Sequence, residues 1–175
     1  LGKGHDDTYW NGSITVPVDL EGDGFMEVVT GRQFQEWDGT VRCFTGEYDG
    51  WPAVADLDGD GDAEVVISGR NRVLIYDHQC DFVDGWNLEA SGRGGPPTIA
   101  DYDGDGVPEI GFAAADRYTV YETNGTLKWS SPANDNSSNC TGSSVFDFEE
   151  DGYAEVVYGD ETDLWVISGH SGDFV

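Results

Sequence analysis

The sequence predicts an all-β fold made of about four repeated units, each with four short antiparallel strands. An acidic nine-residue loop occurs four times, beginning at Asp19, Asp56, Asp101 and Asp147. Each loop leads directly into an apolar, largely β-branched run, and no stretch keeps the apolar period of a helix. A repeat of roughly 45 residues with four strands is typical of a propeller blade. The predicted fold is therefore a partial or half β-propeller.

The expected strands follow the same order in each unit, with the acidic loop between the first two. The first unit has them at 13–18, 27–30, 34–37 and 40–44. The second unit has them at 53–55, 64–68, 72–76 and 86–89. The third unit has them at 98–100, 110–113, 118–121 and 126–129. The fourth unit has them at 144–146, 155–158 and 164–167, and its fourth strand is missing or barely begun. The pairs Asp38-Gly39 and Asn124-Gly125 are strong hairpin signals between third and fourth strands.

These units are expected to form a single domain over residues 1–175. The repeats run approximately over 12–48, 49–94, 95–139 and 140–175, the last being incomplete. Residues 1–11 are polar and lack periodicity, which indicates the tail of a preceding unit. Because the chain begins without a methionine, we expect a mature product or an excised piece.

Aromatic residues recur near the third strand of every unit. They are Trp37, Tyr76, Tyr121 and Trp165. We expect them to pack between neighbouring blades, and stacking against carbohydrate is the alternative.

The repeated loop has the composition of a cation site. Carboxylates stand at positions one, three, five and nine, and a glycine at position six permits the sharp turn that aims them inward. Hard cations such as Ca²⁺ take about six to eight oxygen ligands. The loop is not an EF-hand, because that motif places its bidentate glutamate at position twelve between two helices. We predict up to four Ca²⁺ ions, one per loop; the alternative is a set of acidic surface turns without metal.

The predicted ligands are four side chains and one backbone carbonyl in each loop. The carbonyl comes from position seven, where the side chain varies as expected if only the backbone binds. The full set is Asp19, Glu21, Asp23, Phe25, Glu27, Asp56, Asp58, Asp60, Asp62, Glu64, Asp101, Asp103, Asp105, Val107, Glu109, Asp147, Glu149, Asp151, Tyr153 and Glu155.

The loop pattern Asp-x-Asp-x-Asp-Gly-x-x-Glu, followed by Val-Val-x-x-Gly, resembles the FG-GAP/VCBS repeats of integrin α-subunit β-propellers and their bacterial relatives. The resemblance covers nearly the whole chain. It implies Ca²⁺ between the first two strands of each blade. It also implies an extracellular or cell-surface setting, often in adhesion or as one module of a larger secreted protein.

The chain departs from that pattern in three ways. Position three is Glu21 in the first loop and Glu149 in the last, one methylene longer than Asp. Position four of the last loop is Glu150 instead of Gly, which predicts weaker binding or altered geometry there. Integrin-type propellers have seven blades, so these four could close a small ring, form half of a ring completed by a second copy, or be a fragment. An open edge strand favours association. We therefore expect self-association, such as a homodimer that completes a ring, or a truncated context.

Composition excludes several classes of partner. The net charge is −27, from 8 basic and 35 acidic residues, which argues against nucleic acid and anionic membrane surfaces. No apolar run of about 18 residues exists, so no membrane insertion is predicted.

Three cysteines, Cys43, Cys80 and Cys140, match no zinc or redox spacing. In an oxidising compartment one bridge is slightly favoured, and the sequence does not select the pair.

Three functions fit these observations. The first is a calcium-binding extracellular module with a structural, adhesion or protein-interaction role, whose protein or glycan ligand the sequence does not identify. The second is a carbohydrate-binding, lectin-like propeller, and the third is a non-catalytic scaffold domain of a secreted polysaccharide-active enzyme. We expect no enzymatic activity, because no nucleophile constellation is visible and His5, His78 and His170 fall in turns or linkers.

Overall fold

The computed structural model describes residues 14–46, 50–136 and 141–175 of the chain. Within these residues it forms fifteen strands and no helix, so none of the described residues belongs to a helix that could span a membrane. The expected tail at residues 1–11 and the third cysteine, Cys140, lie outside the described ranges.

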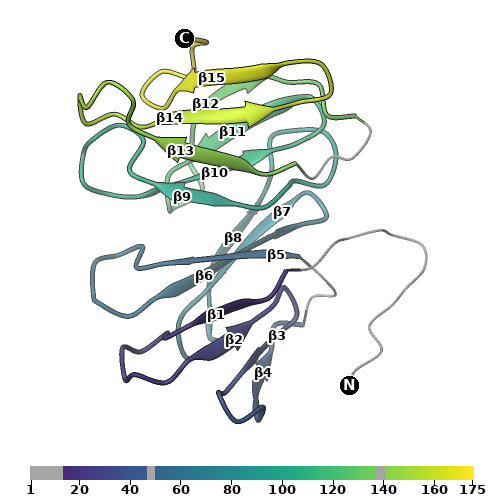
Figure 1. Ribbon diagram of the computed structural model, residues 1–175. Coiled ribbons are helices and arrows are strands. Elements are labelled where there is room, and N and C mark those ends of the chain that lie inside the picture. Colours follow the sequence, from purple (N-terminus) through teal and green to yellow (C-terminus); the bar gives the residue numbers. More distant parts are fainter. Residues whose placement is uncertain (1–13, 47–49, 137–140) are drawn as a thin grey trace.

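The strands form four separate antiparallel sheets in chain order (Figure 1). The first sheet contains β1 (Val16–Val18), β2 (Glu27–Val29), β3 (Gln33–Gln35) and β4 (Val41–Phe44). The second contains β5 (Trp51–Ala55), β6 (Glu64–Gly69), β7 (Arg72–Tyr76) and β8 (Phe82–Asn87). The third contains β9 (Thr98–Ala100), β10 (Glu109–Ala113), β11 (Arg117–Tyr121) and β12 (Leu127–Pro132). The last contains β13 (Ser143–Phe146), β14 (Glu155–Gly159) and β15 (Leu164–Ser168).

This architecture confirms the predicted all-β fold. In each sheet, strands adjacent in sequence pair with each other, as in a meander. The fourth sheet has three strands, and a single bridge between Ile167 and Phe174 marks where a fourth strand would pair.

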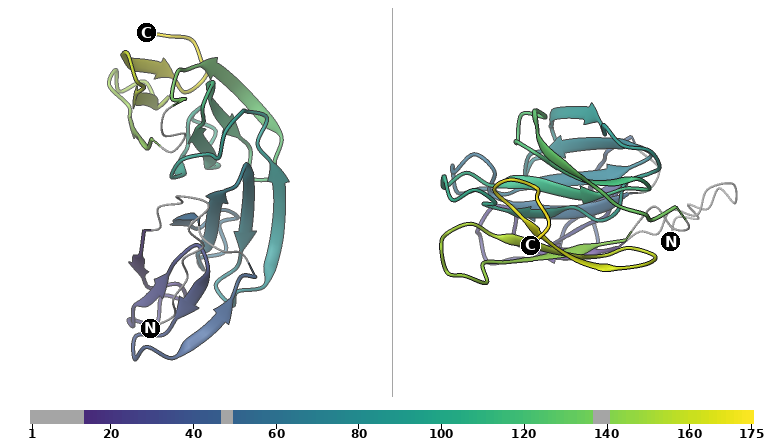
Figure 2. Two further views of the ribbon diagram at one scale, coloured as in Figure 1. Left: turned by 90° about the vertical axis from the view of Figure 1, so that its right-hand side faces the viewer. Right: turned by 90° about the horizontal axis from the view of Figure 1, so that it is seen from above.

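The sheets are arranged like part of a propeller. The first strands of successive sheets are neighbours, because β1 contacts β5, β5 contacts β9 and β9 contacts β13. Viewed from the side, the four sheets follow an arc that does not close (Figure 2, left).

The hydrophobic core lies between consecutive sheets and not within one of them. Phe34 of the first sheet clusters with Ile67 and Tyr76 of the second. The second and third sheets share another cluster, and the third and fourth share the last one. Each sheet therefore relies on its neighbour to cover its apolar face, as expected for blades.

Each outer strand also reaches the hairpin between the third and fourth strands of the next blade. Cys43 of β4 forms a disulfide with Cys80 in the second blade's hairpin, which settles the cysteine pair that the sequence left open. In the next two junctions, tryptophans replace the disulfide. A Cβ on Gly125 would lie 2.9 Å from the Trp86 ring, and one on Gly172 would lie 2.7 Å from the Trp129 ring.

One expected strand is misplaced. The fourth strand of the second unit begins at Phe82 and ends at Asn87, whereas 86–89 was expected. The Asp77 carboxylate accepts the amides of Gln79 and Asp81 at 2.9 and 2.8 Å, and this closes the hairpin within five residues. Residues 77–81 are mostly polar, and this composition alone does not distinguish a five-residue turn from the longer one that was expected.

Of the four recurrent aromatic residues, Tyr76 and Tyr121 are buried between blades, as expected. Trp165 packs against the cluster between the third and fourth sheets, also as expected. Trp37 differs, because it is 65% exposed and stacks on Phe25 within its own blade.

Candidate metal centre

Four acidic loops join the first and second strands of the four sheets, and Figure 1 shows them along the same side of the molecule. They are the first loop (residues 19–27), the second loop (56–64), the third loop (101–109) and the fourth loop (147–155). The first loop touches the second, and the third touches the fourth. The Ala63 amide donates to the Leu20 carbonyl at 3.0 Å, and a Cβ on Gly104 would lie 2.6 Å from the Gly152 carbonyl oxygen.

The aspartate at position one closes each loop. Its Oδ2 accepts a hydrogen bond from the backbone amide of the glycine at position six in all four loops. The pairs are Gly24–Asp19 at 2.8 Å, Gly61–Asp56 at 3.0 Å, Gly106–Asp101 at 2.9 Å and Gly152–Asp147 at 3.0 Å.

The glutamate at position nine anchors each loop to the strand that follows. It is buried, and its Oε2 accepts the amide of position two. The pairs are Leu20–Glu27 at 3.0 Å, Leu57–Glu64 at 2.7 Å, Tyr102–Glu109 at 2.7 Å and Phe148–Glu155 at 3.0 Å. This bond uses one carboxylate oxygen and leaves Oε1 for another partner.

The third loop brings together a complete set of candidate side-chain ligands. One ligand atom each from Asp101, Asp103, Asp105 and Glu109 lies within 4.8 Å of the others. Asp103 Oδ1 is buried without a hydrogen-bond partner among the described residues. An orphaned carboxylate oxygen in an all-oxygen cluster fits a hard cation such as Ca²⁺.

The second loop brings together Asp56, Asp58 and Glu64 within the same 4.8 Å. Among the described residues, no such group forms in the first or fourth loop. These two loops keep the bonds to the amides of positions two and six, but the bond from the position-four amide to the position-one aspartate, present at Gly59 and Gly104, is found within the described ranges only in the second and third loops.

Three of the four residues at position seven have exposed side chains. Phe25, Val107 and Tyr153 are 53%, 44% and 38% exposed. Their amides, and that of Asp62, donate to the position-five carboxylate at 2.8–3.0 Å. The role of their carbonyls as ligands stays a prediction.

A basic side chain from the fourth strand enters the third loop. Lys128 Nζ lies 2.5 Å from Asp103 Oδ2, 2.9 Å from Glu109 Oε1 and 3.0 Å from Glu122 Oε1. Burial alone would lower the pKa of Lys128, but its hydrogen bonds to these carboxylates outweigh burial and raise it.

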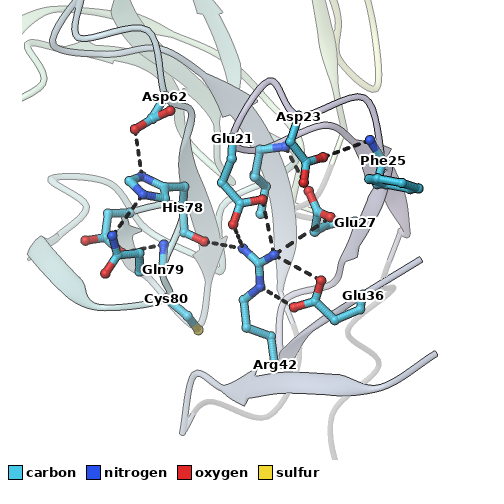
Figure 3. Close-up of polar contacts among 12 residues, drawn as sticks. Glu21, Asp23, Phe25, Glu27, Glu36, Arg42, Asp62, His78, Gln79 and Cys80 are labelled. Atoms are coloured by element: carbon cyan, nitrogen blue, oxygen red, sulfur yellow. Dashed lines mark hydrogen bonds and ion pairs between the residues drawn. The ribbon is translucent and has the colours of Figure 1, made fainter. Parts of the chain in front are cut away.

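Arg42 does the same in the first loop (Figure 3). Its guanidinium lies 2.7 Å from Glu21, 3.7 Å from Glu27 and 2.6 Å from Glu36, and it donates to the His78 carbonyl of the next blade at 2.7 Å. The longer side chain at position three therefore reaches an internal cation in this loop.

The electrostatics of the loops favour a bound cation. Burial raises the pKa of Glu64 and of Glu109, so their charged forms are disfavoured in the folded protein without compensation. The hydrogen bond from Lys128 lowers the pKa of Asp103. In the fourth loop, the charge of Glu155 raises the pKa of Glu149.

The sequence analysis did not identify Arg42 and Lys128. The available signal was a basic residue at the second position of the fourth strand in two of the units. The basic residue indicates a contact with the acidic loop only once the fourth strand is known to pass beside that loop.

Comparison with protein families matches a model described as an FG-GAP-like repeat to residues 56–112 and 101–158, which together exceed half of the chain. Comparison with curated proteins gives no match.

Solved structures share the fold at low sequence identity. The V. cholerae biofilm matrix protein Bap1 has a TM-score of 0.75 and 13% identity, over 93% of this chain and 54% of that one. The rhamnogalacturonan lyase YesW has a TM-score of 0.64 and 16% identity, over 91% and 41%. An Agrocybe aegerita lectin that recognises non-reducing terminal N-acetylglucosamine has a TM-score of 0.57 and 17% identity, over 93% and 51%. This chain thus spans about half the length of these proteins or less.

Proposed function

Because the chain belongs to the family of FG-GAP-like repeat proteins, we propose that it is a calcium-binding extracellular β-propeller module with a structural, adhesion or protein-interaction role. The observation that carries the proposal is the third loop, where four carboxylates converge and one buried oxygen lacks a partner. When bound there, Ca²⁺ would supply positive charge that offsets the repulsion among these carboxylates.

The donor set supports calcium over other metals. The clustered candidate ligands of the second and third loops are all carboxylates, which disfavours zinc and other metals that prefer nitrogen or sulfur ligands. Asp101, Asp103, Asp105 and Glu109 would hold the ion in the third loop, and the corresponding predicted residues would do so elsewhere.

The extracellular setting rests on chemistry as well as on the family. Disulfides persist in oxidising compartments and are rare in the cytosol. The Cys43–Cys80 bridge is therefore compatible with secretion or cell-surface exposure. The adhesion or interaction role follows from the same setting, and the excess of acidic residues disfavours nucleic acid as the partner.

Thermal unfolding in millimolar calcium and in chelator tests the metal proposal. Each occupied site adds RT ln(1 + [Ca²⁺]/Kd), about 2.7 kcal/mol at a hundredfold excess over Kd. We expect a clearly higher melting temperature in calcium. Asp105→Ala should lower the melting temperature in chelator only slightly, because it loses one exposed bond to the Val107 amide, and should reduce the calcium-induced rise, because Asp105 lies in the cluster.

Asp163→Ala is the matched control, since this exposed aspartate lies in the β14–β15 turn, away from the acidic loops. It should leave the calcium-induced rise unchanged. Equal melting temperatures of the original protein with and without calcium would contradict the proposal.

Carbohydrate binding is a second candidate. Phe25 and Trp37 form a stacked pair with ring centroids 5.6 Å apart, and both rings are more than half exposed. Exposed aromatic faces suit the apolar faces of sugars. Two structurally similar proteins, a lectin and a rhamnogalacturonan lyase, agree with this possibility, although the fold alone carries no ligand specificity.

A glycan array with the original protein and with Trp37→Ala distinguishes the two candidates. Binding that the substitution abolishes would favour the lectin-like role or a non-catalytic scaffold for a polysaccharide-active enzyme. An array without binding would leave the structural and protein-interaction role. Neither candidate assigns catalysis to this chain.

A further inference from the structure

The second blade has a pocket where the first and third blades place a basic side chain. The strand register makes the three positions equivalent. Gln35 pairs with Val41, Tyr76 with Phe82 and Tyr121 with Leu127, each beside a bulge. The residue after each of these partners is Arg42, Val83 or Lys128.

The three blades also share the carboxylates that surround this position. In the third blade they are Asp103 at loop position three, Glu109 at loop position nine, and Glu122, the residue after β11. The equivalents in the second blade are Asp58, Glu64 and Asp77. The second blade thus keeps the three acids and has Val83 where the other two blades have Arg42 and Lys128; His78 also lines the pocket, with Nδ1 3.6 Å from Asp62 Oδ2.

A cavity of about 320 Å³ lies at the position that a basic side chain fills in the first and third blades. Its lining includes all three acids, together with Ile75, Val83 and Thr123. Thr123 belongs to the third blade, and the strand register makes it equivalent to His78 of the second blade. At the junction between the first and second blades, the His78 carbonyl accepts a hydrogen bond from Arg42. The pocket therefore lies at the blade junction that the cation fills in the first blade.

Glu64 provides an independent sign of a missing partner. The residue is 7% exposed, and its Oε2 accepts the Leu57 amide. In the third blade the other oxygen of the equivalent glutamate, Glu109 Oε1, bonds Lys128 at 2.9 Å. No ion pair of a described residue reaches Glu64, which lines the cavity.

We propose that this pocket binds an ammonium or guanidinium group on an apolar stem, such as a lysine or arginine side chain, supplied from outside the described residues. The three acids would receive the charged group, and Ile75 and Val83 would contact the stem. The proposal goes beyond calcium binding and does not require it, because Arg42 and Lys128 show that these acids accept an organic cation beside the loop.

Amide NMR titration of the protein with N-acetyl-lysine methylamide, in calcium and separately in chelator, tests the proposal. We expect saturable shifts at the amides of Asp58, Glu64 and Asp77. N-acetyl-norleucine methylamide, which lacks the ammonium group, should bind at least about tenfold more weakly, since a charge-assisted hydrogen bond contributes roughly that factor or more. Equal binding of the two probes, or no saturable shift, would overturn the proposal.

Two variants make the test specific. Val83→Lys places a lysine in the pocket, as Lys128 does in the third blade, and should abolish the shifts. Arg72→Lys, at the far end of the adjacent strand β7, is the control and should leave the shifts unchanged. Asp58 and Glu64 are also predicted calcium ligands, so loss of the shifts in calcium alone would show that the metal ion takes these acids in place of an organic cation, and would overturn the proposal.

A further arm separates the sources of the cation. Tighter binding of a lysine-containing peptide than of n-butylammonium would indicate a protein partner. Equal binding would indicate a free amine. Both outcomes support the proposed binding of an organic cation. Failure of calcium to stabilise the protein would be seen in the melting experiment and would leave this result unaffected.

Discussion

At the scale of single residues, Glu150 occupies a backbone conformation that the other three loops give to glycine. Its φ is 57°, and the glycines at the same position have φ values of 68°, 79° and 73°. The fourth loop therefore keeps the shape of the others despite its different sequence. Left-handed backbone costs a non-glycine residue roughly 1–2 kcal/mol, so the retained shape is strained.

Glu150→Gly should consequently raise the free energy of unfolding by about 1 kcal/mol. Urea denaturation in chelator measures this without a contribution from metal. Glu150→Gln removes the charge and keeps the strain, so it should raise stability less. Gly59→Ala is the reverse control, because its φ is 79° and a Cβ there meets nothing within 4 Å. Equal gains from the Gly and Gln variants would assign the effect to charge.

At the scale of elements, the contact between an outer strand and the next hairpin holds neighbouring blades together. The hairpins at Gly39 and Gly125 are closely matched. In each, the glycine amide donates at 2.9 Å to the carbonyl three residues earlier, and φ is 85° and 79°. They differ in one respect, since Trp86 of the preceding blade covers Gly125 and no described atom lies within 4 Å of a Cβ on Gly39.

Gly125→Ala should therefore destabilise the protein more than Gly39→Ala. Both pay for an unfavourable φ, about 1 kcal/mol, but only the first inserts a methyl group against the Trp86 ring, which adds about 1–3 kcal/mol. Chemical denaturation of the two variants under one condition gives the difference directly. Equal losses would mean that the tryptophan contact does not couple the second and third blades.

At the scale of the whole molecule, the two terminal sheets carry most of the exposed large hydrophobic residues. Leu164 and Phe146 in the fourth blade are 73% and 62% exposed, and Trp37 and Phe44 in the first are 65% and 61% exposed. In the two middle blades, Phe82, Val83 and Val107 are the only ones among the described residues. Because each core cluster lies between two sheets, the first and last sheets each have one face without a neighbouring sheet among the described residues.

We expect a second copy of the chain to supply that neighbour. Light scattering should then give twice the chain mass of 19.0 kDa in millimolar calcium, and less dimer in chelator because the loops that brace the terminal sheets loosen. Leu164→Ser should weaken the dimer, since burial of a leucine contributes roughly 1.5–3 kcal/mol. Phe82→Ser in the second blade is the control and should not. A monomer in both conditions would contradict this expectation.

The sequence by itself determined the repeat, the loops and most strands of this protein, because these features depend on local patterns. Alternating apolar residues specify strands, and glycines at positions with positive φ specify the turns. The same local logic placed the position-nine glutamate at the start of a strand or, for Glu109, directly before it, and the structure finds this residue buried in all four blades.

Only the tertiary structure decided which distant side chains meet. Cys43 and Cys80 are 37 residues apart, and their pairing depends on how one blade's outer strand meets the next hairpin. The approach of Arg42 and Lys128 to the acidic loops, and the pocket that Val83 leaves, likewise depend on strand register across a sheet. A sequence pattern reports neighbours along the chain, whereas charge compensation acts through space over a few ångströms, so the cation-filled and cation-free blades become distinguishable only after folding.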